Sequence, residues 1–214
     1  MFPEYTKPEK TEFYTSSYPD LPEFKEPGKE SLYVGQGYAE MSVDNRSILS
    51  EGFSSCIALV LQDYKTGNAA LFHIDDIDLR NDFNRKQTLV VQNLLERHLL
   101  SISIPEKERE LLLFTIKEIC NYQYPTKMKR EECREKMARW VSGQIQARFV
   151  VGTTGRYGVA ERVYKDFLSN VGMFLKPLIV IDSGDFHWGI VYKPGEKRIL
   201  VQTDNQKKLL TFLF

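Results

Sequence analysis

Two short apolar runs, separated by residues that favour turns, stand out in the first third of the chain. Residues 57–61 and 69–74 are almost wholly apolar, and the polar segment 63–68 lies between them. Asp, Thr, Gly and Asn, which all occur in that segment, are typical of tight turns. The pattern therefore predicts two buried strands joined as an antiparallel hairpin.

The register of this hairpin decides which side chains face each other. In an antiparallel pair, residues equidistant from the centre of the turn lie opposite one another. A turn centred on Tyr64 and Lys65 places Cys56 opposite His73. A turn centred on Gly67 would separate the two side chains by a few residues, so the register stays open at this point.

Apolar residues recur at helical spacing farther along the chain. This spacing predicts helices over 86–100, 106–122, about 130–142, and around Val159, Val163 and Phe167. Further strands are expected at 32–42, 147–151, 178–181, 188–192 and 198–203. Strand pairs flanking helices predict an α+β fold, a layered α/β sandwich with mixed or antiparallel sheets flanked by helices.

Length and proline content suggest how the chain is divided. At roughly 150 residues per domain, 214 residues correspond to one domain with additions. Residues 1–30 hold five of the nine prolines, which disfavour helices and sheet ladders. We therefore expect an extended leader over 1–30 and a single domain over 31–214, with a helical insertion at about 79–146.

Charge and composition exclude several classes of partner. The 29 basic residues balance the 29 acidic ones, and no long basic stripe is present, so nucleic acid is not expected as a partner. No apolar run approaches the roughly 18 residues that span a bilayer, so no membrane span is expected. Three cysteines without a C-x-x-C pair favour a reducing compartment, and the three histidines show no zinc-ligand spacing. We expect neither a metal nor another cofactor.

Cys56 and His73 are the residues best suited to carry chemistry. A cysteine becomes a nucleophile as its thiolate, and a histidine across a hairpin can accept its proton. Cys56 also follows a Gly-Phe-Ser-Ser turn, whose backbone N–H groups could hold an oxyanion. The pair alone is weak evidence, because a lone cysteine is more often a small buried apolar residue and a histidine in an apolar strand is more often part of the core.

Several motifs add to this pair in chain order. They are Tyr33-Val-Gly-Gln-Gly-Tyr38, Ser50-x-Gly-Phe-Ser-Ser-Cys56-Ile-Ala-Leu-Val-Leu-Gln-Asp63, Gly67-x-Ala-Ala-Leu-Phe-His73, Ala147-Arg-Phe-Val-Val-Gly152, Val180-Ile-Asp-Ser-Gly184 and Gly189-Ile-Val-Tyr-Lys-Pro-Gly195. From about 32 to 203, the chain resembles the chemoreceptor glutamine deamidases of the CheD family.

The resemblance implies a cysteine hydrolase fold that is shared with the catalytic domains of cytotoxic necrotizing factor toxins. By position, Cys56 matches the nucleophile, His73 the base, and Ser50 a hydroxyl residue that is Thr in the family. Phe53, Ser54 and Ser55 would contact the substrate, and Ser54 stands where the family has Gly.

The expected function is a cysteine-dependent amidohydrolase, specifically a deamidase that converts a protein glutamine to glutamate through a thioester on Cys56. The expected partner is a protein with a surface glutamine, either in bacterial chemotaxis or in a host. The chain would accordingly be cytoplasmic or delivered into a host cytosol as a bacterial effector. Alternatives are transglutaminase-like or peptidase-like acyl transfer by the same pair, and a binding module without catalysis.

Overall fold

Two sheets account for all strands in the described residues. The computed structural model describes residues 14–16, 31–75, 85–120, 127–141, 143–152, 179–183, 187–203 and 209–213. The six-stranded sheet has the order β1 (Tyr14–Ser16), β11 (Leu209–Leu213), β10 (Arg198–Thr203), β9 (Trp188–Lys193), β4 (Ser47–Phe53), β2 (Ser31–Tyr33). The five-stranded sheet has the order β3 (Ala39–Ser42), β6 (Ala69–Ile74), β5 (Ile57–Asp63), β7 (Ile145–Val151), β8 (Ile179–Asp182).

Each sheet is antiparallel apart from one parallel pair, β2 with β4 and β7 with β8. A short 3₁₀ turn, η3 (Pro194–Glu196), joins β9 to β10. The mixture of two such sheets with helices confirms the predicted α+β class.

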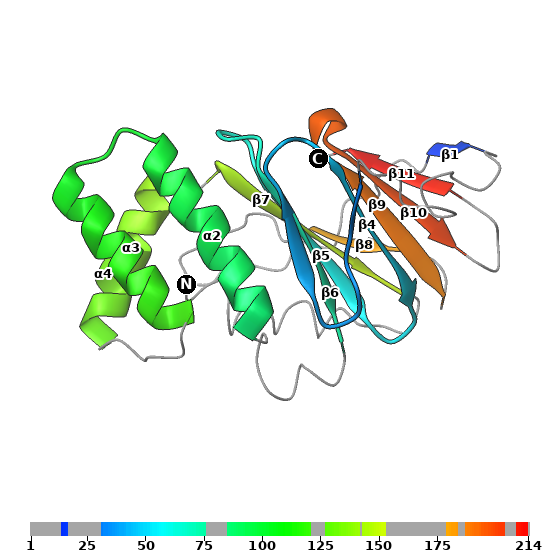
Figure 1. Ribbon diagram of the computed structural model, residues 1–214, viewed down its shortest axis with the longest axis horizontal. Helices are drawn as coiled ribbons and strands as arrows, with labels where there is room; N and C mark the ends of the chain where they lie inside the picture. The colour runs from blue at the N-terminus through cyan, green and yellow to red at the C-terminus, as the bar shows by residue number, and fades with distance from the viewer. Residues whose placement is uncertain are drawn as a thin grey trace.

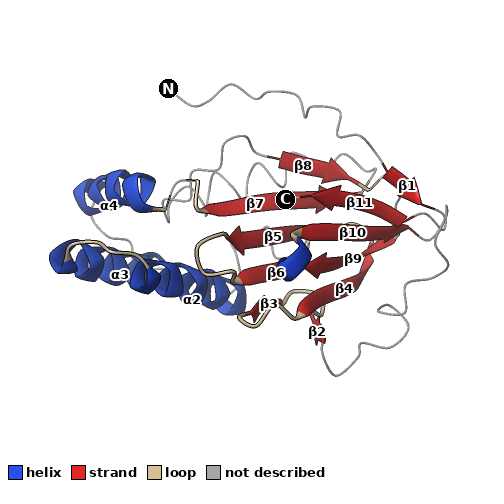
Figure 2. Cartoon of the chain, turned by 90° about the horizontal axis from the view of Figure 1, so that it is seen from above, coloured by secondary structure: helices blue, strands red, loops and turns tan. Residues whose placement is uncertain are grey.

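Three helices cover the five-stranded sheet on the side away from the six-stranded sheet (Figure 1). They are α2 (Arg85–Ser101), α3 (Glu106–Cys120) and α4 (Lys127–Trp140), and they match the predicted helices to within a few residues. Helix α2 runs beside β3 and β6, as Figure 2 shows from a second direction. The order of layers is therefore helices, five-stranded sheet, six-stranded sheet.

Alternating side chains of β5 divide the interior into two cores. Ile57, Leu59 and Leu61 pack with residues of the helices. Ala58 and Val60 point the other way and pack with residues of the six-stranded sheet. Because successive side chains of a strand face opposite sides, an unbroken apolar run such as β5 is the pattern of a strand covered on both faces.

The predicted hairpin is present as β5 and β6, and its ladder decides the register that the sequence left open. Ala58, and not Cys56, lies opposite His73. The ladder centres the turn between Lys65 and Thr66, one residue later than the centre that would place Cys56 opposite His73. A shift of one residue in the centre of a turn moves the facing position by two residues.

The side chain of Asp63 explains this register. Its carboxylate accepts hydrogen bonds from the backbone N–H of Lys65 at 2.8 Å and from the hydroxyl of Thr66 at 2.5 Å. Gly67 then adopts a φ of 76° and donates to the Asp63 carbonyl at 2.9 Å. The hairpin therefore closes with the bond from Asp63 N–H to the Asn68 carbonyl, at 2.8 Å, because an aspartate of this kind stabilises the turn that follows it.

Other differences from the expected elements come from short or polar strands. The segment 32–42 forms two strands, β2 and β3, which belong to different sheets. Strand β4 has a polar stretch at residues 50–52 that hid it from the apolar pattern. Strands β1 and β11 pair with each other, although a leader without sheet pairing was expected over 1–30. The remainder of that leader and the predicted helix near 159–167 lie outside the described residues.

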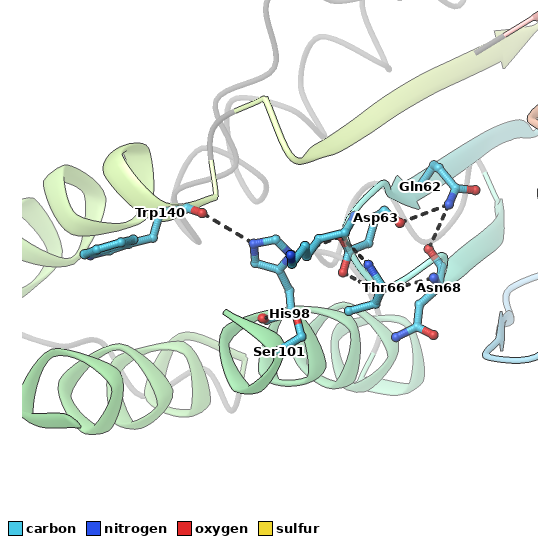
Figure 3. Close-up of polar contacts among 8 residues, drawn as sticks. Gln62, Asp63, Thr66, Asn68, His98, Ser101 and Trp140 are labelled. Atoms are coloured by element: carbon cyan, nitrogen blue, oxygen red, sulfur yellow. Dashed lines mark hydrogen bonds and ion pairs between the residues drawn. The ribbon is translucent and has the colours of Figure 1, made fainter. Parts of the chain in front are cut away.

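A buried contact between an aspartate and a histidine joins the hairpin turn to the helices (Figure 3). Nδ1 of His98, on α2, lies 3.0 Å from Oδ1 of Asp63, and both side chains are fully buried. Nε2 of His98 lies 3.4 Å from the carbonyl of Trp140 on α4. Burial raises the pKa of Asp63, but the hydrogen bonds from His98 and Thr66 and the charge of His98 outweigh it, so the pKa lies below its ordinary value.

We expect Asp63→Ala to destabilise the fold by about 3 kcal/mol, because it leaves His98 buried without its ionic partner and removes the turn contacts. Thermal or urea unfolding measures the loss. The control is Asp44→Ala, which removes an exposed aspartate that bonds Arg46 and Ser42, and its effect should be much smaller. Equal losses in the two variants would contradict the assigned role of Asp63. Folding lowers the pKa of Asp63, so the stability that its ionised carboxylate provides is fully present above the unfolded pKa near 3.8. This stability is lost as the pH falls from there through the lower folded pKa.

Candidate active site

Three polar residues singled out by the sequence face the core between the sheets. Ala58 belongs to this core, and so does Cys56, two residues earlier. His73 lies opposite Ala58 and therefore points to the same side. Ser50 reaches the core from β4 in the other sheet, two residues after Ile48, which also belongs to it. The exposed fractions of Cys56, His73 and Ser50 are 3%, 1% and 0%.

A bulge in β4 lets two side chains three residues apart point into the same core. Ser50 pairs with Ile190 and Phe53 with Trp188, and the register shifts between these two pairs. Gly52 lies inside the bulge with a φ of 75°, a conformation that favours glycine. The bulge therefore brings both Ser50 and Phe53 next to His73.

A chain of hydrogen bonds determines which ring nitrogen of His73 carries the proton. The Ser50 hydroxyl donates to the Val34 carbonyl at 2.6 Å, and Ser50 Oγ lies 2.9 Å from His73 Nδ1. A serine has a single hydroxyl proton, and a carbonyl can only accept. Nδ1 of His73 therefore carries the proton and donates to Ser50. In the neutral ring, this leaves the lone pair on Nε2, as a general base requires.

Nε2 of His73 is buried and has no hydrogen-bond partner among the described residues. Leaving such an atom unpaired costs about 1–3 kcal/mol, so buried polar atoms of this kind are uncommon and occur at functional sites. Burial lowers the pKa of His73 to about 4, against an opposing effect of the charge on Asp75. The ring is therefore neutral at neutral pH and able to accept a proton.

Aromatic rings hold the imidazole in its plane. Phe53 stacks on His73 with 3.7 Å between ring centroids and an angle of 14°. Trp188 stacks on the other side of this pair, against Phe53, at 4.1 Å. Phe53 was expected to contact the substrate, but it is fully buried and supports the imidazole instead.

The backbone of His73 is also held on both sides. Its N–H donates to the Tyr38 carbonyl, and its carbonyl accepts from the Gly37 N–H, each at 3.0 Å. The same carbonyl accepts from the side-chain amide of Gln87, on α2, at 3.2 Å. One side chain of helix α2, in the helical insertion, thus contacts the backbone of His73.

The thiol of Cys56 contacts a carboxylate that sequence reasoning did not assign to the site. Continued by one pair, the β5–β6 ladder places Cys56 opposite Asp75. The Cys56 thiol donates to Oδ1 of Asp75 at 3.8 Å, and the side-chain amide of Gln36 donates to Oδ2 at 2.5 Å. The signal in the sequence was the position of Asp75, two residues after His73 and hence on the same face of the strand.

Cys56 and His73 are thus diagonal neighbours on one face rather than directly opposed residues. Diagonal positions of an antiparallel pair are about 7–8 Å apart, within reach of long or aromatic side chains. Ser54 and Ser55 are partly exposed and lie in the bend before Cys56, where substrate contacts were expected.

His98, the other buried histidine, differs from His73 in its contacts. Both ring nitrogens of His98 have acceptors nearby, from Asp63 and Trp140. The contact of His98 with Asp63 could not be predicted from the sequence, because the two residues are 35 positions apart. Because both ring nitrogens of His98 are engaged by groups of the fold, His98 supports the fold rather than the chemistry.

No protein-family model matches the chain, and no curated protein is significantly similar to it. Within the described residues, no group of three or more His, Cys, Asp or Glu side chains could hold a metal ion. No helix in the same part of the chain is long and apolar enough to cross a membrane.

NMR of protein labelled with ¹⁵N histidine tests the protonation state of His73. We expect a neutral ring with its proton on Nδ1 at pH 7, which remains neutral to about pH 5 and becomes protonated near pH 4. In Ser50→Ala, the preference for the Nδ1 proton should weaken, because the acceptor is lost. Exposed His187 provides the reference signal. A ring protonated on Nε2, or one that titrates near 6.5, would show that the assignment is wrong.

Proposed function

We propose that this chain is a cysteine-dependent amidohydrolase that deamidates glutamine side chains of proteins. The observation that carries the proposal is the unpartnered Nε2 of His73, on a ring oriented by Ser50, on the strand face that also carries the Cys56 thiol. A core histidine of purely structural function would have both nitrogens satisfied, as His98 does.

The reaction begins with transfer of the Cys56 proton to Nε2 of His73. The thiol first leaves Asp75 by rotation of its side chain, and the thiolate then attacks the carboxamide carbon, forming the S–C bond. Backbone N–H groups near Ser54 and Ser55 hold the oxyanion. Nε2 returns the proton to the leaving nitrogen, the C–N bond breaks, and ammonia departs.

Hydrolysis of the thioester completes the cycle. His73 takes a proton from a water molecule, whose oxygen attacks the acyl carbon. The S–C bond breaks, the thiolate recovers a proton, and the substrate leaves with a glutamate side chain. Ser50 keeps Nδ1 protonated throughout, so that Nε2 alternates between base and acid.

The motif order that resembles the CheD family supports this choice of reaction, and the Ser50–His73 bond supports the role that the resemblance gives to Ser50. A protein is the proposed substrate because the partly exposed residues beside the thiol, Ser54, Ser55 and Asp75, include no cation to bind the carboxylate of a free amino acid. We propose an intracellular site of action, in a bacterium or a host cytosol, because the chemistry requires a reduced thiol.

The thiol of Cys56 should react with iodoacetamide faster than that of Cys120 in the folded chain. Cys120 is buried in the helical core, where burial and the charge of Glu96 raise its pKa to about 12. We expect His73→Ala to slow alkylation of Cys56 by about tenfold or more, because removing a general base commonly costs 10²–10⁴ in rate. Peptide mapping by mass spectrometry gives both rates. Continued protection of Cys120 shows that the variant is folded.

Deamidation itself is measured as ammonia release and as the mass gain from amide to acid in reduced, unfolded casein and in lysate proteins. We expect wild type to show both changes and Cys56→Ser to show neither. Adding a primary amine tests the alternative reaction, because an amine that ends up attached to the glutamine reveals acyl transfer in place of hydrolysis. Turnover by Cys56→Ser equal to that of wild type would rule out the proposed nucleophile.

A further inference from the structure

The carboxylate of Asp75 contacts both a thiol and a carboxamide, the two kinds of group that react with each other in the proposed reaction. Oδ1 accepts from the Cys56 thiol, the proposed nucleophile, at 3.8 Å. Oδ2 accepts from the side chain of Gln36 at 2.5 Å. The group bound to Oδ2 is thus a carboxamide, the functional group on which the proposed reaction acts.

The chemistry of the carboxylate determines which end of the amide it binds. An ionised carboxylate only accepts hydrogen bonds, so it must face the nitrogen of a carboxamide and not its oxygen. Charge assistance makes such a bond roughly twice as strong as one between neutral groups. A glutamate side chain in the same position would place two negative charges together. The geometry therefore favours glutamine over glutamate.

Gln36 is presented in a way that resembles a glutamine on the surface of another protein. It lies in a tight turn, closed by the bond from Tyr38 N–H to the Gly35 carbonyl at 3.1 Å, and is exposed to solvent. Gly37 follows it with a φ of 76°, as turns of this kind require. The Gly37 N–H is bonded to the His73 carbonyl, so the turn is fixed beside the site.

We propose that Asp75 is the residue that recognises the carboxamide nitrogen of the substrate, and that Gln36 occupies this position in the resting chain. The incoming glutamine replaces Gln36 on Oδ2, and the thiol is released from Oδ1 towards His73. After hydrolysis, the new carboxylate of the product is repelled by Asp75, which favours its release. This inference rests on the proposed function.

Two alkylating reagents test Asp75 without an identified substrate. Iodoacetamide carries a carboxamide and iodoacetate a carboxylate, and both attach to the same sulfur with loss of iodide. The ratio of their rates at Cys56 cancels the fraction of thiolate, which is common to both. The ratio in the urea-unfolded chain gives the intrinsic preference of the thiol.

We expect the folded chain to prefer iodoacetamide by about tenfold more than the unfolded chain, as one charge-assisted contact provides. Asp75→Asn should reduce this preference to within about twofold of the unfolded value, because it removes the charge but keeps the shape. The matched control is Glu51→Gln, which removes an exposed carboxylate next to Ser50. It should leave the preference as in wild type.

The possible results separate this inference from the proposed function. If His73→Ala slows both reagents but Asp75→Asn leaves the ratio unchanged, Asp75 does not read the amide, and the proposed function stands. If His73→Ala affects neither reagent while Cys120 stays protected, the proposed base is wrong. An equal change in Asp75→Asn and Glu51→Gln would mean that general surface charge, and not the contact, sets the ratio.

Gln36→Ala tests the resting occupant separately. Removal of the competing amide should raise the rate with iodoacetamide by a few fold and raise the preference for it over iodoacetate, because one competitor for Oδ2 is lost. An unchanged or lower preference in Gln36→Ala would overturn the assignment of Gln36 as the occupant. The control is Gln146→Ala, which removes a partly buried side-chain amide on β7. A core residue such as Leu49 would not serve as the control.

Discussion

A buried imidazole nitrogen without a hydrogen bond is the constraint on which the candidate site depends. An unpaired buried atom of this kind costs about 1–3 kcal/mol, which is a sizeable part of the stability of a typical domain. Ser50 engages Nδ1, and Phe53 holds the plane of the ring, so Nε2 stays where no described residue bonds it. The surrounding contacts therefore maintain an arrangement that is unfavourable for the fold and useful for proton transfer.

The segment that crosses from one sheet to the other supplies most of these contacts. The Val34 carbonyl accepts a hydrogen bond from Ser50, Gly37 and Tyr38 bond the backbone of His73, and Gln36 bonds Asp75. Since β2 and β3 belong to different sheets, this segment also fixes how the two sheets meet at the site. A displacement of the crossing segment would change the orientation of the base, its support and the carboxylate together.

The sequence predicted those features that depend on local patterns. The apolar runs of β5 and β6 and the stripes of α2, α3 and α4 are properties of neighbouring residues, and they were found. The register of the hairpin stayed open because the side chain of Asp63, and not the symmetry of the turn, sets its centre. The pairing of Asp75 with Gln36 was missed because the two residues are 39 positions apart and meet only through the fold.

The charge of Asp75 acts in opposite directions on the two partners of the proposed proton transfer, His73 and Cys56. This charge raises the pKa of His73, which favours the imidazolium, whereas burial lowers the pKa. The charge would also repel the thiolate that the proposed reaction forms at Cys56, because like charges at short range are unfavourable. The two effects oppose each other, so the carboxylate gives little net assistance to formation of the ion pair. A group that assists the proton transfer so little is better explained by what it binds before the transfer, and the carboxamide of Gln36 occupies that position in the folded chain.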